Sequence, residues 1–184
     1  MGQYVGLDVS LKETTVCILD EAGGAVWRGR CRSEPESMAA MLKQCAPLAE
    51  RVVLESGPLS TWHWHGLRDR GVPVICVDAR SAKAALSGRI NKSDELDAEG
   101  LAQLARTGWY SEVRVKSLDS HRLRSALVAR ARLVNMKRTL SNTIRGLLRS
   151  IGLFAGRASR REFADEVRSL TATEPLLGPA MEAS

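Results

Sequence analysis

The order of hydrophobic and polar positions divides the chain into a strand-like beginning and a largely helical remainder. Residues 4–9, 14–19 and 25–30 are short runs of apolar, often β-branched side chains, which are typical of strands. The sequence Asp-Glu-Ala-Gly-Gly at 20–24 separates the second run from the third and has the composition of a turn. These runs predict a three-stranded antiparallel meander.

The middle of the chain alternates between helical and strand-like patterns. Apolar positions at helical spacing predict one helix that begins at Ser33 or Ser37 and a second over residues 59–70. Short apolar runs at 51–55 and 73–77 predict two strands. Because buried strands joined by helices pair in parallel, we expect an α/β fold in which the meander leads into parallel units.

Two further helices complete the expected order β-β-β-α-β-α-β-α and a long helical arm. Residues 93–107 carry apolar positions at helical spacing and end at Gly108. Residues 118–151 lack proline and repeat apolar residues in heptads, so they predict one helix that spans about 50 Å. This pattern favours a helical hairpin or an intermolecular coiled coil. The residues expected to form its seam are Leu133, Leu140, Ile144 and Leu147.

Positive charge is concentrated in the arm. The chain of 184 residues has a formal net charge of +6, and residues 116–168 contain 13 Lys and Arg but only four Asp and Glu. A basic extension on a nearly neutral domain is typical of nucleic-acid binding, and a solvated surface helix is the alternative. We therefore expect a compact domain over 1–115, a basic helical arm over 116–168, and a flexible tail or truncated linker over 169–184.

The basic residues expected to contact nucleic acid form two groups. The first group precedes the predicted helix 93–107 on a glycine-containing loop and consists of Lys83, Arg89 and Lys92. The second group lies on the arm and consists of Arg122, Arg124, Arg130, Arg132, Lys137, Arg138, Arg145 and Arg149.

Composition excludes several classes of protein. With 44% hydrophobic and 26% charged residues the chain is globular, and no apolar run is long enough to span a membrane. The beginning of the chain has no leader-like pattern, so a cytoplasmic prokaryotic protein is expected. The four cysteines form no CxxC pair and are expected to be reduced thiols. The Trp-His-Trp-His sequence at 62–65 invites a zinc or base-stacking interpretation, but residues two apart on a helix face apart, which favours a structural role.

Four acidic residues carry the candidate chemistry. Asp8 interrupts an apolar strand and Glu55 ends another, and a carboxylate in such a position is costly unless it is paired or binds a cation. Asp94 and Asp97 begin a predicted helix on one face, where capping and first-turn roles are the alternative. Since parallel strands bring their carboxyl ends to one edge of a sheet, the four side chains can form an oxygen-ligand site for one or two Mg²⁺ or Mn²⁺ ions. Such a site would support phosphodiester cleavage.

The segments around these acids resemble a known set of motifs. Tyr-Val-Gly-Leu-Asp-Val-Ser at 4–10, Val-Leu-Glu-Ser-Gly at 53–57 and Asn-Lys-Ser-Asp-Glu-Leu-Asp-Ala at 91–98 are similar to the three DEDD motifs of a ribonuclease H-like (RuvC-like) domain. The combination resembles the N-terminal domain of the insertion-sequence family one-ten transposases, which include Piv-type DNA invertases and recombinases guided by a bridge RNA. The resemblance covers about residues 3–150.

The resemblance implies a fold, a chemistry and partners. It implies a RuvC-like mixed sheet with flanking helices followed by a helical, coiled-coil arm that forms a dimer or tetramer. It further implies metal-dependent cleavage and exchange of DNA strands with Mg²⁺ or Mn²⁺, and a structured guide RNA as a second nucleic-acid partner. The implied catalytic and metal-binding residues are Asp8, Glu55, Asp94 and Asp97.

The family pattern also includes a C-terminal domain with a serine nucleophile, so the chain is expected to be the N-terminal part of such a protein. Three other functions compete with the transposase interpretation. One is a stand-alone RuvC-like endonuclease that resolves DNA junctions. The others are an actin-like or sugar-kinase ATPase and a non-catalytic RNA- or DNA-binding assembly module.

Overall fold

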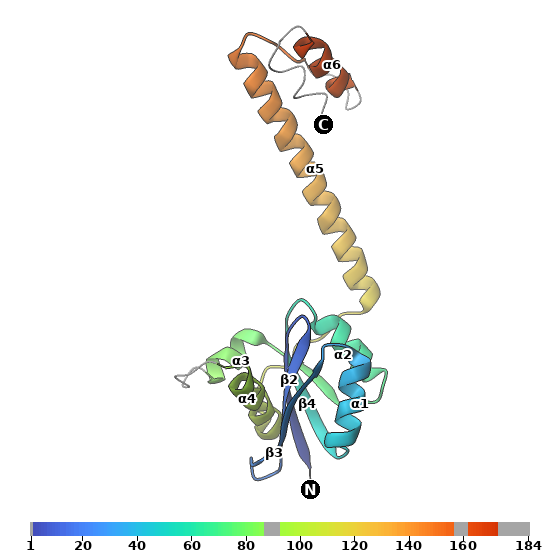
Figure 1. The fold of residues 1–184 in the computed structure, drawn as a ribbon, viewed down its shortest axis with the longest axis vertical. Coiled ribbons are helices and arrows are strands. Elements are labelled where there is room, and N and C mark those ends of the chain that lie inside the picture. The colour runs from blue at the N-terminus through green and yellow to red at the C-terminus, as the bar shows by residue number, and fades with distance from the viewer. Residues whose placement is uncertain (1, 87–92, 157–161, 173–184) are drawn as a thin grey trace. The chain divides into compact units, whose positions relative to one another are not determined.

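The computed structural model describes residues 2–86, 93–156 and 162–172, and the chain divides into two compact units, residues 1–122 and 123–184. The boundary between the units lies inside a helix, and the functional division at residue 115 stays a prediction. The elements, drawn in Figure 1, are β1 (Gln3–Val9), β2 (Glu13–Leu19), β3 (Ala25–Arg32), α1 (Pro35–Cys45), β4 (Ala49–Glu55), α2 (Ser60–Arg68), β5 (Val74–Val77), α3 (Ala79–Leu86), α4 (Asp94–Thr107), α5 (Leu118–Ser150) and α6 (Glu162–Thr171).

The strands form one five-stranded mixed sheet in the order β3-β2-β1-β4-β5. β1 pairs antiparallel with β2 and parallel with β4. β3 adds antiparallel to β2, and β5 adds parallel to β4. The predicted meander, the parallel units and the α/β class are therefore confirmed, and β1 is the central strand.

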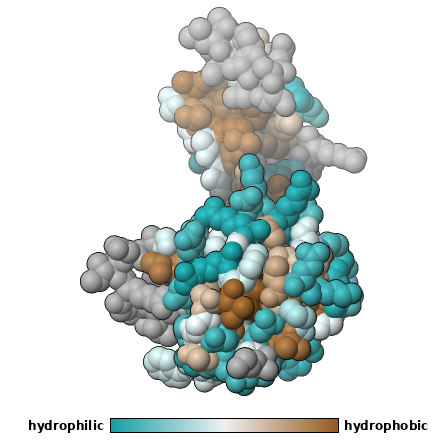
Figure 2. All heavy atoms as spheres, turned by 60° about the horizontal axis from the view of Figure 1, so that its bottom comes forward, coloured by the Kyte–Doolittle hydropathy of each residue, from teal (hydrophilic) through white to brown (hydrophobic). Residues whose placement is uncertain are grey.

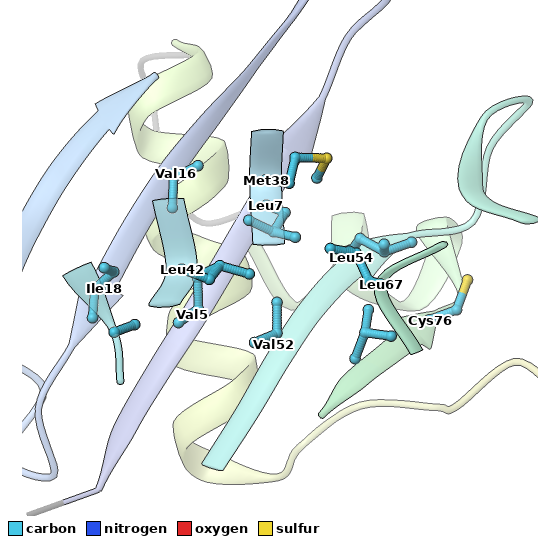
Figure 3. Packing of buried hydrophobic residues seen from close by; sticks show 12 residues of the cluster. Val5, Leu7, Val16, Ile18, Met38, Leu42, Val52, Leu54, Leu67 and Cys76 are labelled. Carbon is cyan, nitrogen blue, oxygen red and sulfur yellow. The ribbon is translucent and has the colours of Figure 1, made fainter. Parts of the chain in front are cut away.

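One face of the sheet packs against α1 and α2. Val5 and Leu7 of β1 are fully buried with Val52 and Leu54 of β4, and Met38 of α1 lies in the same cluster (Figure 3). Figure 1 shows α1 and α2 on this side of the sheet and α3 and α4 on the other. The two-residue period of a strand sends every second side chain to the opposite face, so the residues between these belong to the α4 side.

On the α4 side, the centre of β1 is a glycine. Gly6 lies directly beneath α4, where a Cβ atom would overlap the carbonyl oxygen of Ala98 and the nitrogen of Ala102. Both alanines are fully buried, in a cluster with Cys17 and Leu19 of β2. These small residues let the backbone of α4 approach the backbone of β1, which fixes the helix on the sheet.

Helix α3 is absent from the predicted order of elements. Asp78 precedes it and accepts hydrogen bonds at Oδ2 from the backbone N–H (2.9 Å) and the hydroxyl (3.0 Å) of Ser81, which stabilise the first turn. These bonds, chiefly the backbone one, hold the pKa of Asp78 below its ordinary value. Lys83 therefore lies in a helix rather than in the predicted loop, while Arg89 and Lys92 lie outside the described residues.

Helix α1 does not begin with either of the two expected serine caps. Its first residue is Pro35, a residue favoured in the first turn, and the preceding Glu34 makes no side-chain cap bond. Ser33 is buried instead, with its hydroxyl 2.8 Å from Oγ1 of Thr14. This serine therefore joins the start of α1 to the sheet.

In the second unit, α5 is one continuous helix of 33 residues, as predicted. The additional helix α6 packs near its end, where Leu148 and Val167 are buried together and Ile144 packs against them. Residues 169–171, expected in the tail, belong to α6, and residues 173–184 lie outside the described part of the chain. No helix within the described ranges is both long and apolar enough to cross a membrane.

Candidate active site

Asp8 and Glu55 lie at the carboxyl ends of two adjacent parallel strands. Leu7 of β1 pairs with Leu54 of β4, so Asp8 and Glu55 are the next residues along their strands. Glu55 also pairs with Val77 of β5. The expected position of the two acids on neighbouring strands is confirmed.

Both acidic side chains belong to the sheet face that α4 covers. Because side chains alternate along a strand, Asp8 shares the face of Gly6, and Glu55 shares the face of Val53. Gly6 lies beneath α4, and Val53 packs in a cluster with Leu101 of that helix. The two carboxylates therefore lie on one face at one end of the sheet.

The direction of α4 brings its first turn toward the same end. Arg51 of β4, which pairs with Tyr4 near the start of β1, donates from Nη1 to the carbonyl oxygen of Ala105 at 3.0 Å. The last turns of α4 thus lie over the beginnings of β1 and β4. The N-terminus of the helix is consequently directed toward the ends of these strands, where Asp8 and Glu55 lie.

Asp94 and Asp97 share the face of α4 that packs on the sheet. Asp94 lies one turn before the buried Ala98, and Asp97 lies one turn before the buried Leu101. Ser93 is the N-cap, because its hydroxyl accepts a backbone hydrogen bond of the first turn at 3.3 Å. The alternative that Asp94 caps the helix is therefore wrong, and both acids occupy the first turn, where the helix dipole favours negative charge.

The chemistry of the four carboxylates suits a hard divalent cation. Mg²⁺ and Mn²⁺ prefer oxygen ligands. The side chains of Asp8 and Asp97 are half-buried, whereas those of Glu55 and Asp94 are exposed. Among the residues that the structure describes, no three His, Cys, Asp or Glu side chains are placed to hold one ion together. Convergence of the tetrad to coordination distance stays a prediction.

The Trp-His-Trp-His segment contains a structural histidine. His63 is fully buried, with Nδ1 2.9 Å from the carbonyl oxygen of Leu59 and Nε2 3.1 Å from that of Ser33. His65 uses Nε2 for a separate contact of 2.9 Å with the carbonyl oxygen of Lys116. The two rings therefore have different partners, which supports the structural interpretation over a shared zinc site.

The cysteines are free thiols, as expected. Burial raises the pKa of Cys17, Cys31 and Cys76, so these thiols stay protonated above the ordinary pKa of cysteine. Cys17 also lies beside the guanidinium of Arg28, which acts in the opposite direction and lowers its pKa. Protonated, buried thiols are poor nucleophiles and poor metal ligands.

Most of the basic residues predicted on the arm are exposed. Arg122 belongs to the first unit and pairs with Asp119 at 2.9 Å. Arg145 is engaged within the second unit, since its guanidinium lies 4.3 Å from the centre of the Phe163 ring and donates to the carbonyl oxygen of Gly156 at 3.4 Å. The exposed members of the set are Arg124, Arg130, Arg132, Lys137, Arg138 and Arg149.

Strand β3 carries a row of three arginines that the sequence analysis did not predict as functional residues. Arg28, Arg30 and Arg32 alternate with the half-buried Trp27 and Cys31. The signal that identifies them is the two-residue period of the predicted strand, which puts all three on one face.

The comparisons with known proteins point to one family. Residues 5–153 match the transposases of the DEDD type that belong to insertion sequence IS110. The chain is 29% identical over 183 residues to the transposase for insertion sequence element IS1111A of Coxiella burnetii, which covers 98% of this chain and 48% of that protein. It is 28% identical over 177 residues to a probable family 20 transposase of Pseudomonas aeruginosa, which covers 96% of this chain and 50% of that protein. The chain thus spans about half the length of the curated relatives it matches.

Two solved structures align with part of the chain. The Thermus thermophilus RuvC structure has 15% sequence identity and a TM-score of 0.43, and covers 60% of this chain and 99% of that one. The T. thermophilus RuvC in complex with a Holliday junction substrate has 13% identity and a TM-score of 0.44, and covers 61% of this chain and 100% of that one.

The family match covers most of the chain, including every strand of the sheet, with β1 from Val5 onward. The expected mixed sheet with flanking helices and a long helix after it is confirmed. The match over most of the chain also decides against an actin-like or sugar-kinase ATPase. Because residues 5–153 match this family, the chain belongs to the DEDD transposases of the insertion sequence IS110 family.

Proposed function

We propose that this chain supplies the metal-binding carboxylates for metal-dependent cleavage and exchange of DNA strands, as the N-terminal part of a longer transposase. Its catalytic and metal-binding residues in this proposal are Asp8, Glu55, Asp94 and Asp97. The observation that supports it is the placement of the four acids. Asp8 and Glu55 lie at the ends of two neighbouring parallel strands, and Asp94 and Asp97 lie in the first turn of the helix that covers the same face of the sheet. The relatives are transposases by name, which agrees with this chemistry.

The fold holds these negative charges in fixed positions. Asp8 lies in the central strand, whose neighbours β2 and β4 flank it on both sides. Asp94 and Asp97 lie in a turn capped by Ser93. Their mutual repulsion favours the binding of a cation over the free site. Mg²⁺ or Mn²⁺ bound by these carboxylates would activate the attacking oxygen and stabilise the leaving oxygen of a phosphodiester.

Thermal unfolding with and without metal tests the proposal. Wild-type protein is expected to gain about 1.4 kcal/mol at a tenfold excess of Mg²⁺ or Mn²⁺ over its Kd, which raises Tm by about 5 °C. Asp8→Asn is expected to lose this shift, because the central ligand is gone. Circular dichroism in EDTA and in metal measures both proteins.

The matched control is Asp69→Asn, which changes an exposed aspartate at the end of α2. This variant is expected to keep the full metal-dependent shift. The Tm of each variant in EDTA is the baseline from which its metal-dependent shift is measured. Equal metal shifts in wild type and Asp8→Asn would contradict the proposal.

We also propose that the basic residues bind nucleic acid, either the DNA substrate or a structured guide RNA. The excess of bases over acids in residues 116–168 supports this role. The residues proposed for it are the exposed arm bases named above, together with Lys83, Arg89, Lys92, Arg122 and Arg145. The last two would have to leave the contacts that they make with Asp119 and Phe163.

Exposed apolar side chains on α5 support self-association as a dimer or tetramer. Leu133, Leu140 and Leu147 are 66%, 61% and 62% exposed, although they recur at heptad spacing. Hydrophobic residues, drawn brown, show on the surface of the second unit in Figure 2. A helix of this length is marginal in water unless such a seam is covered.

Charging the seam is expected to separate the copies. The double variant L133E/L140E should behave as a monomer in light scattering at about 100 μM, because four or more buried charges per assembly are costly. The control is Asn142→Glu, an exposed position on the other side of α5 that should leave the mass unchanged. A wild-type protein that is strictly monomeric at this concentration would refute the seam.

A further inference from the structure

Edge strand β3 carries three arginines on the sheet face that holds the candidate carboxylates. Trp27 and Cys31 pack on the side of the sheet that α1 covers. The alternate residues Arg28, Arg30 and Arg32 therefore belong to the side that α4 covers.

Arg28 anchors this face of β3 to α4. Its Nη2 atom donates to Oε2 of Glu99 at 2.6 Å, and its guanidinium lies beside the buried thiol of Cys17. Arg28 therefore has partners within the first unit. Its contact with α4 agrees with the placement of the three arginines on the face of the sheet that α4 covers.

The strand register aligns Arg30 with Asp8. Thr15 of β2 pairs with Asp8 on one side and with Arg30 on the other. Because adjacent strands lie about 4.8 Å apart, about 10 Å separates the α-carbons of Asp8 and Arg30. Arg32, which pairs with Glu13, lies further along in the direction in which β1 ends.

Arg30 and Arg32 are the available members of the row. Both are exposed, and within the described part of the chain neither makes an ion pair or a side-chain hydrogen bond. Glu13 is the cross-strand neighbour of Arg32, yet the two form no ion pair. Two guanidinium groups therefore stand free beside the candidate site.

Open space separates Arg30 from the first turn of α4. A hollow of about 140 Å³ lies there, and it is lined by Thr15, Val16, Arg28, Gly29, Arg30 and Glu95. Thr15 is the direct cross-strand neighbour of Asp8. The hollow therefore lies one strand away from Asp8.

We propose that Arg30 and Arg32 bind the phosphate backbone of the nucleic-acid strand whose phosphodiester reaches Asp8. The inference rests on the proposed function, because it takes the carboxylates as the reaction centre. Residues two apart on a strand lie about 6.7 Å from each other, a separation similar to that of successive phosphates along an extended strand. Each guanidinium can donate two parallel hydrogen bonds to one phosphate.

The negative charge of the candidate site explains why positive side chains are needed beside it. Four carboxylates repel an approaching phosphate, so a strand needs cationic contacts close by to stay near them. The bases of the arm belong largely to the other unit. Arg30 and Arg32 supply positive charge within the unit that holds the carboxylates.

The salt dependence of binding tests the proposal. A fluorescein-labelled single-stranded oligonucleotide of about 20 nucleotides is titrated with the 184-residue chain in EDTA at several salt concentrations between 50 and 200 mM. Loss of two phosphate contacts in R30Q/R32Q should make the slope of log K against log salt shallower by about 1.4. The loss of affinity across this salt range should then be about sevenfold smaller than for wild type.

Two control variants separate charge from folding and from position. R30K/R32K keeps both charges and should keep the wild-type slope. R68Q/R114Q removes two exposed arginines, one on α2 and one beside β5, and should also keep it. A wild-type slope in R30Q/R32Q would overturn the proposal, as would a slope in R68Q/R114Q that falls by the same amount.

A double-mutant cycle tests whether the bound strand lies at Asp8. In EDTA, Asp8→Asn should tighten binding in the wild-type background, because it removes a repelling charge. The gain should be smaller in the R30Q/R32Q background, where the strand is no longer held beside that residue. Equal gains in the two backgrounds would overturn the inference.

The two proposals fail in different measurements. An absent metal shift together with the expected slopes and coupling would refute the metal proposal and would still support the phosphate contacts. A normal metal shift with unchanged slopes would refute the phosphate contacts alone.

Discussion

Replacing Gly6 with alanine is expected to lower the free energy of unfolding of the first unit by about 3 kcal/mol or more, and its Tm by about 10 °C or more. The added Cβ atom would overlap the Ala98 carbonyl oxygen and the Ala102 nitrogen. Both are backbone atoms of α4, so no side-chain rotation can relieve the overlap. The helix must move away from β1 or unfold, and the cost exceeds that of ordinary overpacking between side chains.

The same displacement should disturb the candidate site. Asp94 and Asp97 lie in the first turn of α4, so movement of the helix shifts two of the four carboxylates relative to Asp8. Gly6→Ala should therefore lose the metal-dependent rise in Tm under conditions in which it is still folded. Urea unfolding and metal-dependent melting measure the two effects separately.

Gly57→Ala is the matched control for this substitution. A Cβ atom at Gly57 meets nothing within 4 Å, and its backbone does not have a positive φ. Its stability should stay within about 0.5 kcal/mol of wild type. Equal stability of Gly6→Ala and Gly57→Ala would contradict the close packing of the α4 backbone on β1 at Gly6.

Replacing His63 with alanine is expected to cost about 3 kcal/mol and to lower Tm by about 10 °C. The side chain is fully buried, and it connects α2 to the segment before α1 through the carbonyl oxygen of Ser33. Ser33 in turn donates its backbone N–H to the carbonyl oxygen of Lys12 in the turn after β1. Truncation leaves a cavity and takes the ring away from a buried carbonyl oxygen.

His65→Ala is the control, because His65 lies on the same helix but is only half-buried and makes one side-chain hydrogen bond. Its stability should fall by less than about 1 kcal/mol. Urea unfolding measures the free energy of unfolding of both variants. An equal loss of stability in the two would show that the buried contacts of His63 contribute no more than the contacts of His65.

The strands of the first unit could be predicted because most of them show their burial in the sequence. The centres of β1 and β4 are buried apolar runs, so the acidic residues Asp8 and Glu55 stand out in the sequence. Helix α3 carries no such signal, since it is a short run rich in alanine and its start depends on the bonds between Asp78 and Ser81. Helix α6 depends on packing against Leu148, which local pattern does not reveal.

The arrangement of the site was only partly predictable. That Asp94 and Asp97 share a face follows from helical spacing alone. Their alignment with the ends of β1 and β4 depends on Gly6 beneath α4 and on the hydrogen bond from Arg51 to Ala105, which join residues far apart in the sequence. Arg30 could not be predicted as a site residue, because an arginine on an alternating strand has the pattern of any solvent-facing residue. Only the strand register shows that it is aligned with Asp8.

The arginines of β3 have one more consequence, for the behaviour of the protein at high concentration. β3 is eight residues long, and among the residues that the structure describes it pairs with β2 alone. Its outer backbone groups therefore form a template on which a strand from another molecule could add. The opposite edge is β5, which has four residues and is partly covered by the bridge between Val77 and Glu112. Like charges on two approaching copies of β3 repel each other, and salt screens this repulsion. Charge therefore protects the β3 edge against aggregation, whereas the short length of β5 and the bridge to Glu112 protect the β5 edge. Concentrated salt weakens the protection of β3 and leaves that of β5 unchanged.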